Sequence, residues 1–171
     1  MTPRPRPLSS TPHEIATEVS RGRLLGIDLG GRRVGLAVAD PQTGTIRPLA
    51  TIRRADDEHD AQVLESVVRE QGVGELVVGL PLRMDGTEGP QALSTRVWAE
   101  RIASQLGLPI SMRDERLTSV TAESRLGRPR RGPAGGPPSG RARHAYRARI
   151  DREAAVAILQ AELDDRAAVR A

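Results

Sequence analysis

The order of the apolar segments along the chain constrains its fold more than any other feature of the sequence. Short apolar runs predict five strands, at residues 23–29, 33–39, 45–53, 75–80 and 108–112. Apolar residues at helical spacing predict helices at residues 57–71 and 90–106, and a last helix opened by Asp151. Three strands in a meander followed by alternating helices and strands predict an α/β fold of three layers, with a mixed sheet between helices.

The core of this fold has to be built from aliphatic side chains, because the chain has one Trp, one Tyr and no Phe. Residues 75–80 (ELVVGL) are typical of a strand at the centre of a sheet that is covered on both faces. In the helix at 90–106 we expect Leu93, Val97, Ile102 and Leu106 to point inward. Trp98 on the same helix is expected in the core or at an interface.

A length of 171 residues suits one compact domain, which we place at 23–165. Residues 1–22 contain four prolines and predict a flexible N-terminal extension, and residues 166–171 predict a C-terminal tail. Residues 127–149 contain seven Arg, five Gly, four Pro and no acidic residue. Such a segment buries too little apolar surface to offset its ordering entropy, which predicts a mobile basic loop.

Several classes of protein are excluded by composition. The absence of cysteine excludes disulfides, thiolate nucleophiles and Cys-ligated zinc. No apolar run approaches the roughly 20 residues that a membrane span needs, and prolines and charges occupy the place of a signal peptide. We therefore expect a cytoplasmic protein with no membrane partner. The net charge is +4 and all 26 basic residues are Arg, which contacts phosphate in a bidentate manner.

Three acidic residues stand out by their predicted positions. Asp28 lies inside the first, otherwise apolar strand, Glu115 follows the end of a later strand, and Asp151 opens the last helix. Active sites of parallel α/β sheets gather at strand ends, so these carboxylates can converge if the first and fourth strands are neighbours. Each also has a structural interpretation: Asp28 as a turn residue, Glu115 as an ion-pair partner of a neighbouring arginine, and Asp151 as a helix N-cap.

Clustered carboxylates without a cationic partner repel each other, and a divalent cation offsets that repulsion. Oxygen ligands of this kind suit Mg²⁺ or Mn²⁺. One or two such ions can activate water and stabilise the leaving oxygen in phosphodiester hydrolysis, without a Ser, Cys or His nucleophile.

Four sequence blocks resemble the signature blocks of the YqgF/RuvX family of the RNase H-like superfamily: GIDLGGRRVGLAVAD (26–40), VVGLPLRMDGTEGP (77–90), DERLTS (114–119) and IDREAAVAILQ (150–160). The resemblance spans about residues 23–165. It implies an RNase H-like fold with a five-stranded mixed sheet whose first three strands are antiparallel. It also implies that Asp28, Glu115 and Asp151 are the catalytic acids. The activity it implies is processing of the 5′ end of pre-16S rRNA, and an older assignment for this family is Holliday junction resolution.

Further positions are expected to support substrate binding. The loop at 84–90 should lie near the acids, with backbone N–H groups at the following helix start available to a phosphate. Arg32, Arg33, Arg83 and Arg116 are candidate contacts to a nucleic-acid backbone, although a solvated surface charge is the alternative for each. Thr118 is expected to cap a short helix. The segment at 127–149 is longer and richer in Arg than in relatives, which should strengthen salt-dependent binding.

Two other functions compete with the nuclease hypothesis. The first block also resembles the phosphate loop of actin-like ATPases and sugar kinases, but those proteins need two such domains. A non-catalytic RNA-binding module is the second alternative, and mutation of Asp28 to Asn separates it from an enzyme. Cleavage at two symmetric positions would favour a homodimer, whereas RNA trimming is compatible with a monomer.

Overall fold

The computed structural model describes residues 22–116 and 139–170 of the chain. Its elements in chain order are β1 (Arg23–Leu29), β2 (Arg33–Ala39), β3 (Ile46–Arg53), α2 (Asp57–Gln71), β4 (Val73–Leu80), α3 (Pro90–Leu106), β5 (Ile110–Asp114) and α5 (Gly140–Arg170). The predicted extension before residue 22, the predicted cap Thr118 and residues 127–138 lie outside the described residues.

The strands form one five-stranded mixed sheet in the order β3-β2-β1-β4-β5. β1 pairs antiparallel with β2, which pairs antiparallel with β3, whereas β4 runs parallel to both β1 and β5. This arrangement confirms the expected RNase H-like α/β fold with its first three strands antiparallel. It also makes β1 the central strand and the direct neighbour of β4.

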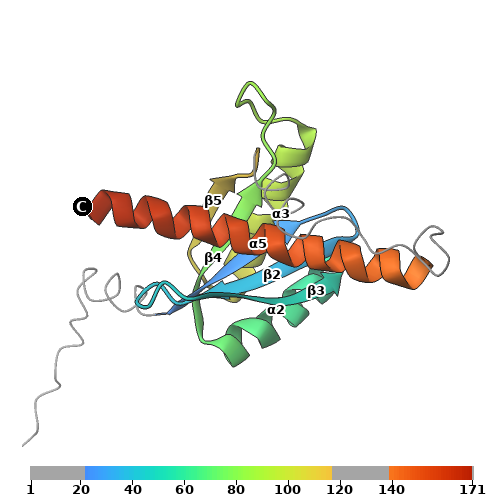
Figure 1. Cartoon of the computed structure of the whole chain (residues 1–171), viewed down its shortest axis with the longest axis horizontal. Coiled ribbons are helices and arrows are strands. Elements are labelled where there is room, and N and C mark those ends of the chain that lie inside the picture. Colours follow the sequence, from blue (N-terminus) through green and yellow to red (C-terminus); the bar gives the residue numbers. More distant parts are fainter. Residues whose placement is uncertain (1–21, 117–138, 171) are drawn as a thin grey trace, which may run out of the picture.

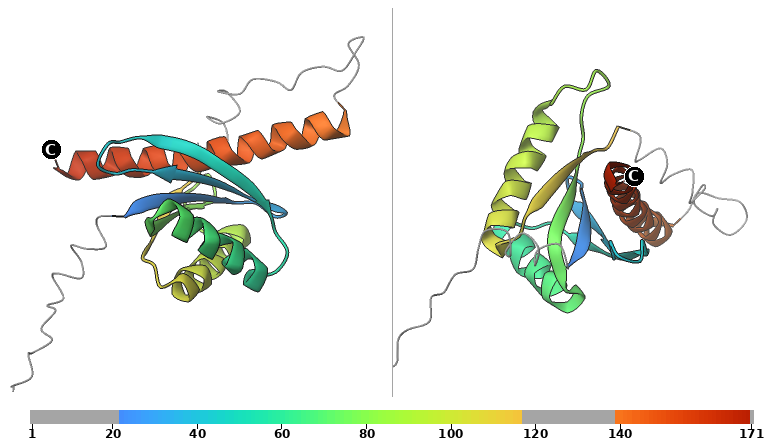
Figure 2. Two further views of the ribbon diagram at one scale, coloured as in Figure 1. Left: turned by 90° about the horizontal axis from the view of Figure 1, so that it is seen from below. Right: turned by 90° about the vertical axis from the view of Figure 1, so that its left-hand side faces the viewer.

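Helices cover both faces of the sheet, which gives three layers (Figures 1 and 2). On one face, Leu25 and Ile27 of β1 pack in a core with residues of α2 and α3. On the other face, Leu24 packs with Ile158 and Leu159 of α5. The two sets alternate along β1 because successive side chains of a strand point to opposite faces.

The ends of α2 and α3 are specified locally by sequence. Asp56 caps α2 by accepting a hydrogen bond from the backbone N–H of His59 at 2.8 Å. Gly72 ends α2 in the left-handed conformation at φ 65°, where glycine carries no steric cost. Pro90 occupies the first turn of α3, as expected for a residue without an N–H group.

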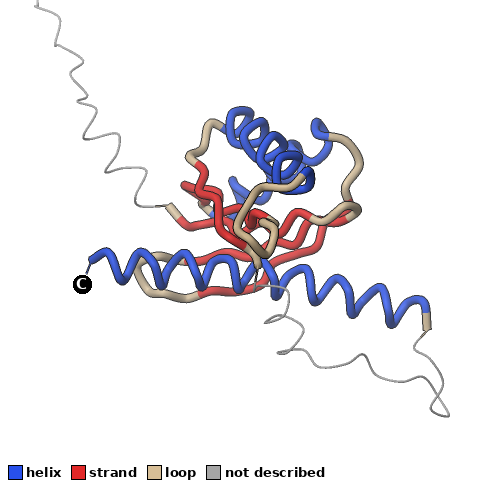
Figure 3. Tube along the Cα trace, turned by 90° about the horizontal axis from the view of Figure 1, so that it is seen from above, coloured by secondary structure: helices blue, strands red, loops and turns tan. Residues whose placement is uncertain are grey.

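The last helix is longer than the sequence pattern predicts. α5 begins at Gly140, so residues 140–149 of the expected loop are helical, and it continues to Arg170 through most of the expected tail (Figure 3). The composition of residues 127–149 taken together favours a loop, but its two parts differ. All of the Gly and Pro residues in that segment lie at or before 140, and the remaining residues are mostly Arg and Ala, which favour helix.

The buried face of α3 also differs in part from the expectation. Ile102 is buried and Leu106 packs against the core, but Leu93 and Val97 are 52% and 56% exposed. The buried stripe follows Thr95, Trp98 and Ile102 instead, because the large indole of Trp98 sets which side of the helix faces the sheet. Trp98 is in the core, as predicted, with the guanidinium of Arg54 above its ring at 5.8 Å from the centroid.

Within the described ranges, no helix has both the length and the apolar character needed to cross a membrane.

Candidate active site

Asp28 lies near the end of the central strand β1, on the face of the sheet that α5 covers. Residues alternate along a strand, and Leu24 in the same strand packs against α5. The residue opposite Asp28 on β2 is Gly35, which places no side chain beside the carboxylate. Asp28 is therefore open on this side to a group that approaches from α5.

Glu115 follows β5 at the same end of the sheet. Its backbone N–H donates to the carbonyl of Leu80 at 3.1 Å, which continues the pairing of β5 with β4. A Cβ added to Gly79 of β4 would lie 1.6 Å from Oε1 of Glu115. The Glu115 carboxyl thus occupies the space that a side chain at position 79 would fill, and it crosses β4 toward Asp28.

The carboxyls of Asp28 and Glu115 are in hydrogen-bonding contact, and both have raised pKa values. Burial raises the pKa of Glu115 from 4.5 to about 8, and the negative charge of Asp28 adds to this shift. Burial also raises the pKa of Asp28 from 3.8 to about 6, assisted by the charge of Asp151. Without a cation, the pair therefore keeps a proton near neutral pH.

One oxygen of this pair has no protein partner. Oε1 of Glu115 is buried and has no hydrogen-bond partner among the described residues. A buried carboxylate oxygen without a partner is costly, and such atoms in native proteins commonly mark a site for an ion or a substrate.

Asp151 approaches Asp28 from α5. The helix passes so close to β2 that a Cβ on Gly35 would lie 2.0 Å from the backbone oxygen of Asp151. The hydroxyl of Thr51 on β3 donates to the carbonyl of Ala148 at 2.7 Å and holds the helix there. Asp151 lies eleven residues after the start of α5, so the prediction that it opens the last helix is wrong, and its alternative interpretation as a helix N-cap is wrong with it.

Asp151 already has a cationic partner. Nε of Arg33 donates to Oδ2 of Asp151 at 2.5 Å. Both side chains are partly exposed, at 23% for Arg33 and 18% for Asp151. The charge of Arg33 also lowers the pKa of Asp28, against the larger effects of burial and of Asp151.

The geometry of the three acids fits a metal only in part. Within residues 22–116 and 139–170, no three His, Cys, Asp or Glu side chains stand close enough together to hold a metal ion in this conformation. Asp28 and Glu115 nevertheless supply adjacent buried oxygens, one of them unpartnered. An all-oxygen donor set of this kind suits Mg²⁺ or Mn²⁺. Asp151 would join them once its carboxylate turns away from Arg33.

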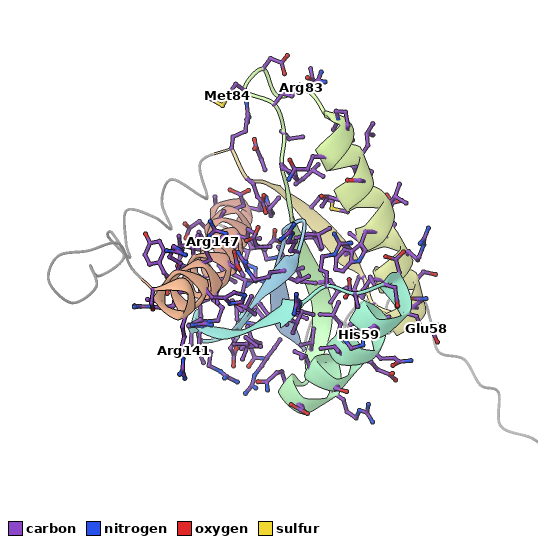
Figure 4. All side chains as sticks on the ribbon, turned by 90° about the vertical axis from the view of Figure 1, so that its right-hand side faces the viewer. Glu58, His59, Arg83, Met84, Arg141 and Arg147 are labelled. Carbon is purple, nitrogen blue, oxygen red and sulfur yellow. The ribbon has the colours of Figure 1, made fainter. Side chains whose placement is uncertain are left out.

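The four candidate arginines lie in two places. Arg33 is in the acid cluster, and the exposed Arg32 precedes it in the turn before β2. Arg83 lies in the loop that joins β4 to α3, beside Met84 (Figure 4), and Arg116, which follows β5, contacts this loop at Met84. Nη1 of Arg116 donates to the carbonyl of Met84 at 3.4 Å, and its guanidinium also pairs with Asp114.

The sequence interpretation missed one part of the site. Gly35 was not singled out, although its place opposite Asp28 in the predicted hairpin is the signal that could have identified it. Gly35 and Gly79 flank β1 on its two sides, and each makes room for one of the other two acids. The predicted phosphate contact at the start of α3 stays a prediction, although its N-cap, Gly89, leaves the first turn without a side-chain cap.

Comparisons with known proteins place the chain in a family. The family described as "RuvX: Holliday junction resolvase" matches residues 22–165. A protein of Anaeromyxobacter sp. (strain Fw109-5) is 44% identical over 144 residues, which cover 84% of this chain and 98% of the relative. A protein of Anaeromyxobacter sp. (strain K) is 46% identical over 145 residues, which cover 85% and 98%. Both relatives carry the name "Putative pre-16S rRNA nuclease".

Among solved structures, the fold is similar to that of T. thermophilus RuvC in complex with Holliday junction substrate, at 15% identity and a TM-score of 0.45. The match covers 77% of this chain and 91% of that one. The family match and the two relatives each span most of the chain, and they confirm the resemblance seen in the four sequence blocks. This chain belongs to the RuvX family.

Proposed function

We propose that this chain is a metal-dependent nuclease that hydrolyses phosphodiester bonds at the site formed by Asp28, Glu115 and Asp151. One observation carries the proposal: two partly buried carboxyls, Asp28 and Glu115, face each other at the end of the central strands with raised pKa values. One of their oxygens, Oε1 of Glu115, is buried and has no partner among the described residues. Such an arrangement opposes the binding of nucleic acid unless a cation is present. The membership of the RuvX family supports the same chemistry.

Mg²⁺ or Mn²⁺ bound between these carboxylates would supply a Lewis acid that activates water and neutralises charge on the phosphate. Asp28 would anchor the cation, because it contacts Glu115 on one side and is close enough to Asp151 on the other for its pKa to respond. Glu115 would orient the attacking water through Oε1. Asp151 would complete the ligand set.

Arg33 would exchange partners during this assembly. In the present structure its guanidinium neutralises Asp151. When Asp151 turns to a cation, Arg33 is left at the edge of the site with its N–H groups free for a phosphate, the ligand that guanidinium groups bind in a bidentate manner. Arg32 in the preceding turn, with Arg83 and Arg116 at the loop above, would extend this positive border.

The proposed substrate is pre-16S rRNA, which the names of the two Anaeromyxobacter relatives give as theirs, and the proposed cleavage is at its 5′ end. Holliday junction resolution is the second candidate, because the family description names it. Both reactions hydrolyse phosphodiester bonds, so the acid cluster serves either. Symmetric cleavage of a junction would require two copies of the chain, whereas trimming of RNA requires one. A cytoplasmic location is part of the same proposal.

A cleavage panel tests the substrate. Labelled pre-16S leader RNA, unstructured RNA and four-way DNA junctions are incubated with the protein in Mg²⁺, in Mn²⁺ and in EDTA. We expect metal-dependent cleavage of the leader RNA. Symmetric cutting of junctions alone would overturn the RNA substrate and leave the nuclease proposal standing. Light scattering on the same samples gives the oligomeric state.

Mutation of Asp28 to Asn tests whether the chain is an enzyme. The substitution removes the central ligand with little change in shape, so turnover should fall by at least about 100-fold while RNA binding persists. Retention of full function by this variant would reject the nuclease and favour a non-catalytic RNA-binding module.

A further inference from the structure

The part of α5 that precedes Asp151 carries charge of one sign. Residues 140–150 contain four Arg and no acidic residue, whereas the rest of the helix contains both acids and bases. This basic N-terminal part of α5 extends beyond the edge of the sheet (Figures 2 and 3). The change in charge along the helix occurs at Asp151, which is one of the acids of the candidate active site.

Helical spacing places two of these arginines on the same side as Asp151. Arg147 is four residues before Asp151 and Arg143 is four residues before Arg147, so the three lie one above the other on one face. Arg149 is two residues from Asp151 and points to the opposite side. Figure 4 shows Arg147 on the side of α5 toward the raised loop that carries Arg83, and Arg141 on the lower side.

The contacts that hold α5 on the sheet determine where the face carrying Arg147 and Asp151 lies. The Thr51–Ala148 hydrogen bond and the close packing of Asp151 on Gly35 both hold the helix within the turn from Arg147 to Asp151. Arg147 therefore lies about one helical turn from the catalytic acid, with Cβ atoms roughly 5–6 Å apart. It is exposed and forms no ion pair with any other residue that the structure describes. Its natural partner at that spacing, Asp151, pairs with Arg33 instead.

An unpaired guanidinium beside a cluster of carboxylates leaves a donor for an incoming anion. We propose that Arg147, continued one turn further out by Arg143, forms a track on α5 that binds backbone phosphates of the nucleic acid next to the scissile phosphate. This inference rests on the proposed nuclease function and deepens it. The track contacts phosphates and not bases, so its binding should not depend on nucleotide sequence. It fits a polynucleotide strand that continues beyond the scissile phosphate.

Binding measurements on a catalytically inactive protein test the track separately from cleavage. In the Asp28→Asn background, fluorescence anisotropy with a labelled 12-nucleotide RNA is measured over a salt series for Arg147→Gln and for Arg149→Gln. Arg149 is the matched control, because it is exposed on the same helix but on the other face. We expect Arg147→Gln to weaken binding about five- to tenfold and to reduce the salt slope by about one, with less than a twofold effect of Arg149→Gln.

Two results would overturn the track. Equal losses for Arg147→Gln and Arg149→Gln would mean that α5 acts only through its general positive charge, and no loss in either would mean that nucleic acid does not contact this part of the helix. In the active protein, Arg147→Gln should raise KM more than it lowers kcat, and the reverse would assign Arg147 to the chemical step instead. If the wild type binds RNA through Arg147 but cleaves no substrate with either metal, the proposed nuclease function fails and the track stands.

Discussion

Replacing Gly79 with Ala should separate activity from stability, because the three atoms nearest to the added methyl group all belong to the side chain of Glu115, a proposed catalytic residue. The new Cβ would lie 1.6 Å from Oε1 of Glu115 and 2.4 Å from its Cδ, whereas ordinary contact begins at 3.4 Å. The Glu115 carboxyl must therefore retreat by about 2 Å, away from Asp28. A misplacement of about 1 Å can already cost a factor of about 100 in rate, so kcat should fall at least 100-fold.

The stability of this variant should change little. The group that has to move is the end of a flexible, partly exposed side chain, and rotation about its own bonds relieves the clash. We expect a loss below about 1 kcal/mol, which corresponds to a Tm shift of about 2–4 °C or less in a protein of this size. The assay pairs RNA cleavage kinetics with thermal unfolding followed by circular dichroism.

Gly35→Ala is the matched control, because it also adds one methyl group beside Asp28. Its Cβ would lie 2.0 Å from the backbone oxygen of Asp151, and a helix backbone cannot rotate away. This variant should lose about 1–3 kcal/mol of stability through displacement of α5. Wild-type turnover in Gly79→Ala would refute the catalytic role of the Glu115 position, and a Tm loss as large as that of Gly35→Ala would show that position 79 serves packing.

The remaining predictions concern charge. In EDTA, Tm should fall as pH rises from about 5 to 9, because the folded protein keeps protons on Asp28 and Glu115 up to pKa values of about 6 and 8, above their ordinary 3.8 and 4.5. Glu115→Gln should remove most of this slope between pH 6 and 9, and an unchanged slope would contradict the assignment. Arg33→Gln should tighten Mn²⁺ binding about two- to tenfold in calorimetry, because it removes a cation that competes with the metal for the Asp151 carboxylate. Weaker Mn²⁺ binding would show that Arg33 does not compete with the metal for Asp151. Glu162→Gln should lower the free energy of unfolding by about 1–3 kcal/mol in urea, because buried Glu162 accepts from both Arg113 and Arg166, and an unchanged midpoint would mean that this network adds no stability.

The topology could be predicted from sequence because local patterns specify it, whereas the family resemblance is what joins the acids into one candidate site. A strand with apolar residues on both sides of Asp28, a Gly-Gly turn and a second apolar strand are all contained in residues 23–39. The run at 75–80 indicated a central strand, and β4 does lie beside β1. Once these two strands are neighbours and run in parallel, the ends that carry Asp28 and the segment before Glu115 must meet at one edge of the sheet.

The setting of Asp151 could not be predicted, because contacts remote in sequence determine it. Its ion pair with Arg33 joins residues 118 positions apart. α5 begins earlier than the pattern predicts because Arg and Ala between 141 and 149 favour helix, whereas the Gly and Pro residues before them make the segment as a whole resemble a loop. The outward orientation of Leu93 and Val97 was missed for a similar reason, since helical spacing alone does not say which of two adjacent stripes Trp98 will turn toward the sheet.

The site holds its acids together against their mutual repulsion, and the two glycines explain how. Gly35 and Gly79 admit Asp151 and Glu115 to either side of Asp28, so the backbone enforces a proximity that the charges oppose. In the metal-free protein two features reduce the repulsion between the carboxylates. The Asp28–Glu115 pair retains a proton, and the guanidinium of Arg33 pairs with Asp151. Both are exchangeable, since a proton can leave and an arginine can turn. In the proposed nuclease, a divalent cation bound between the carboxylates would replace both at once, because it supplies the positive charge that the retained proton and Arg33 supply in its absence.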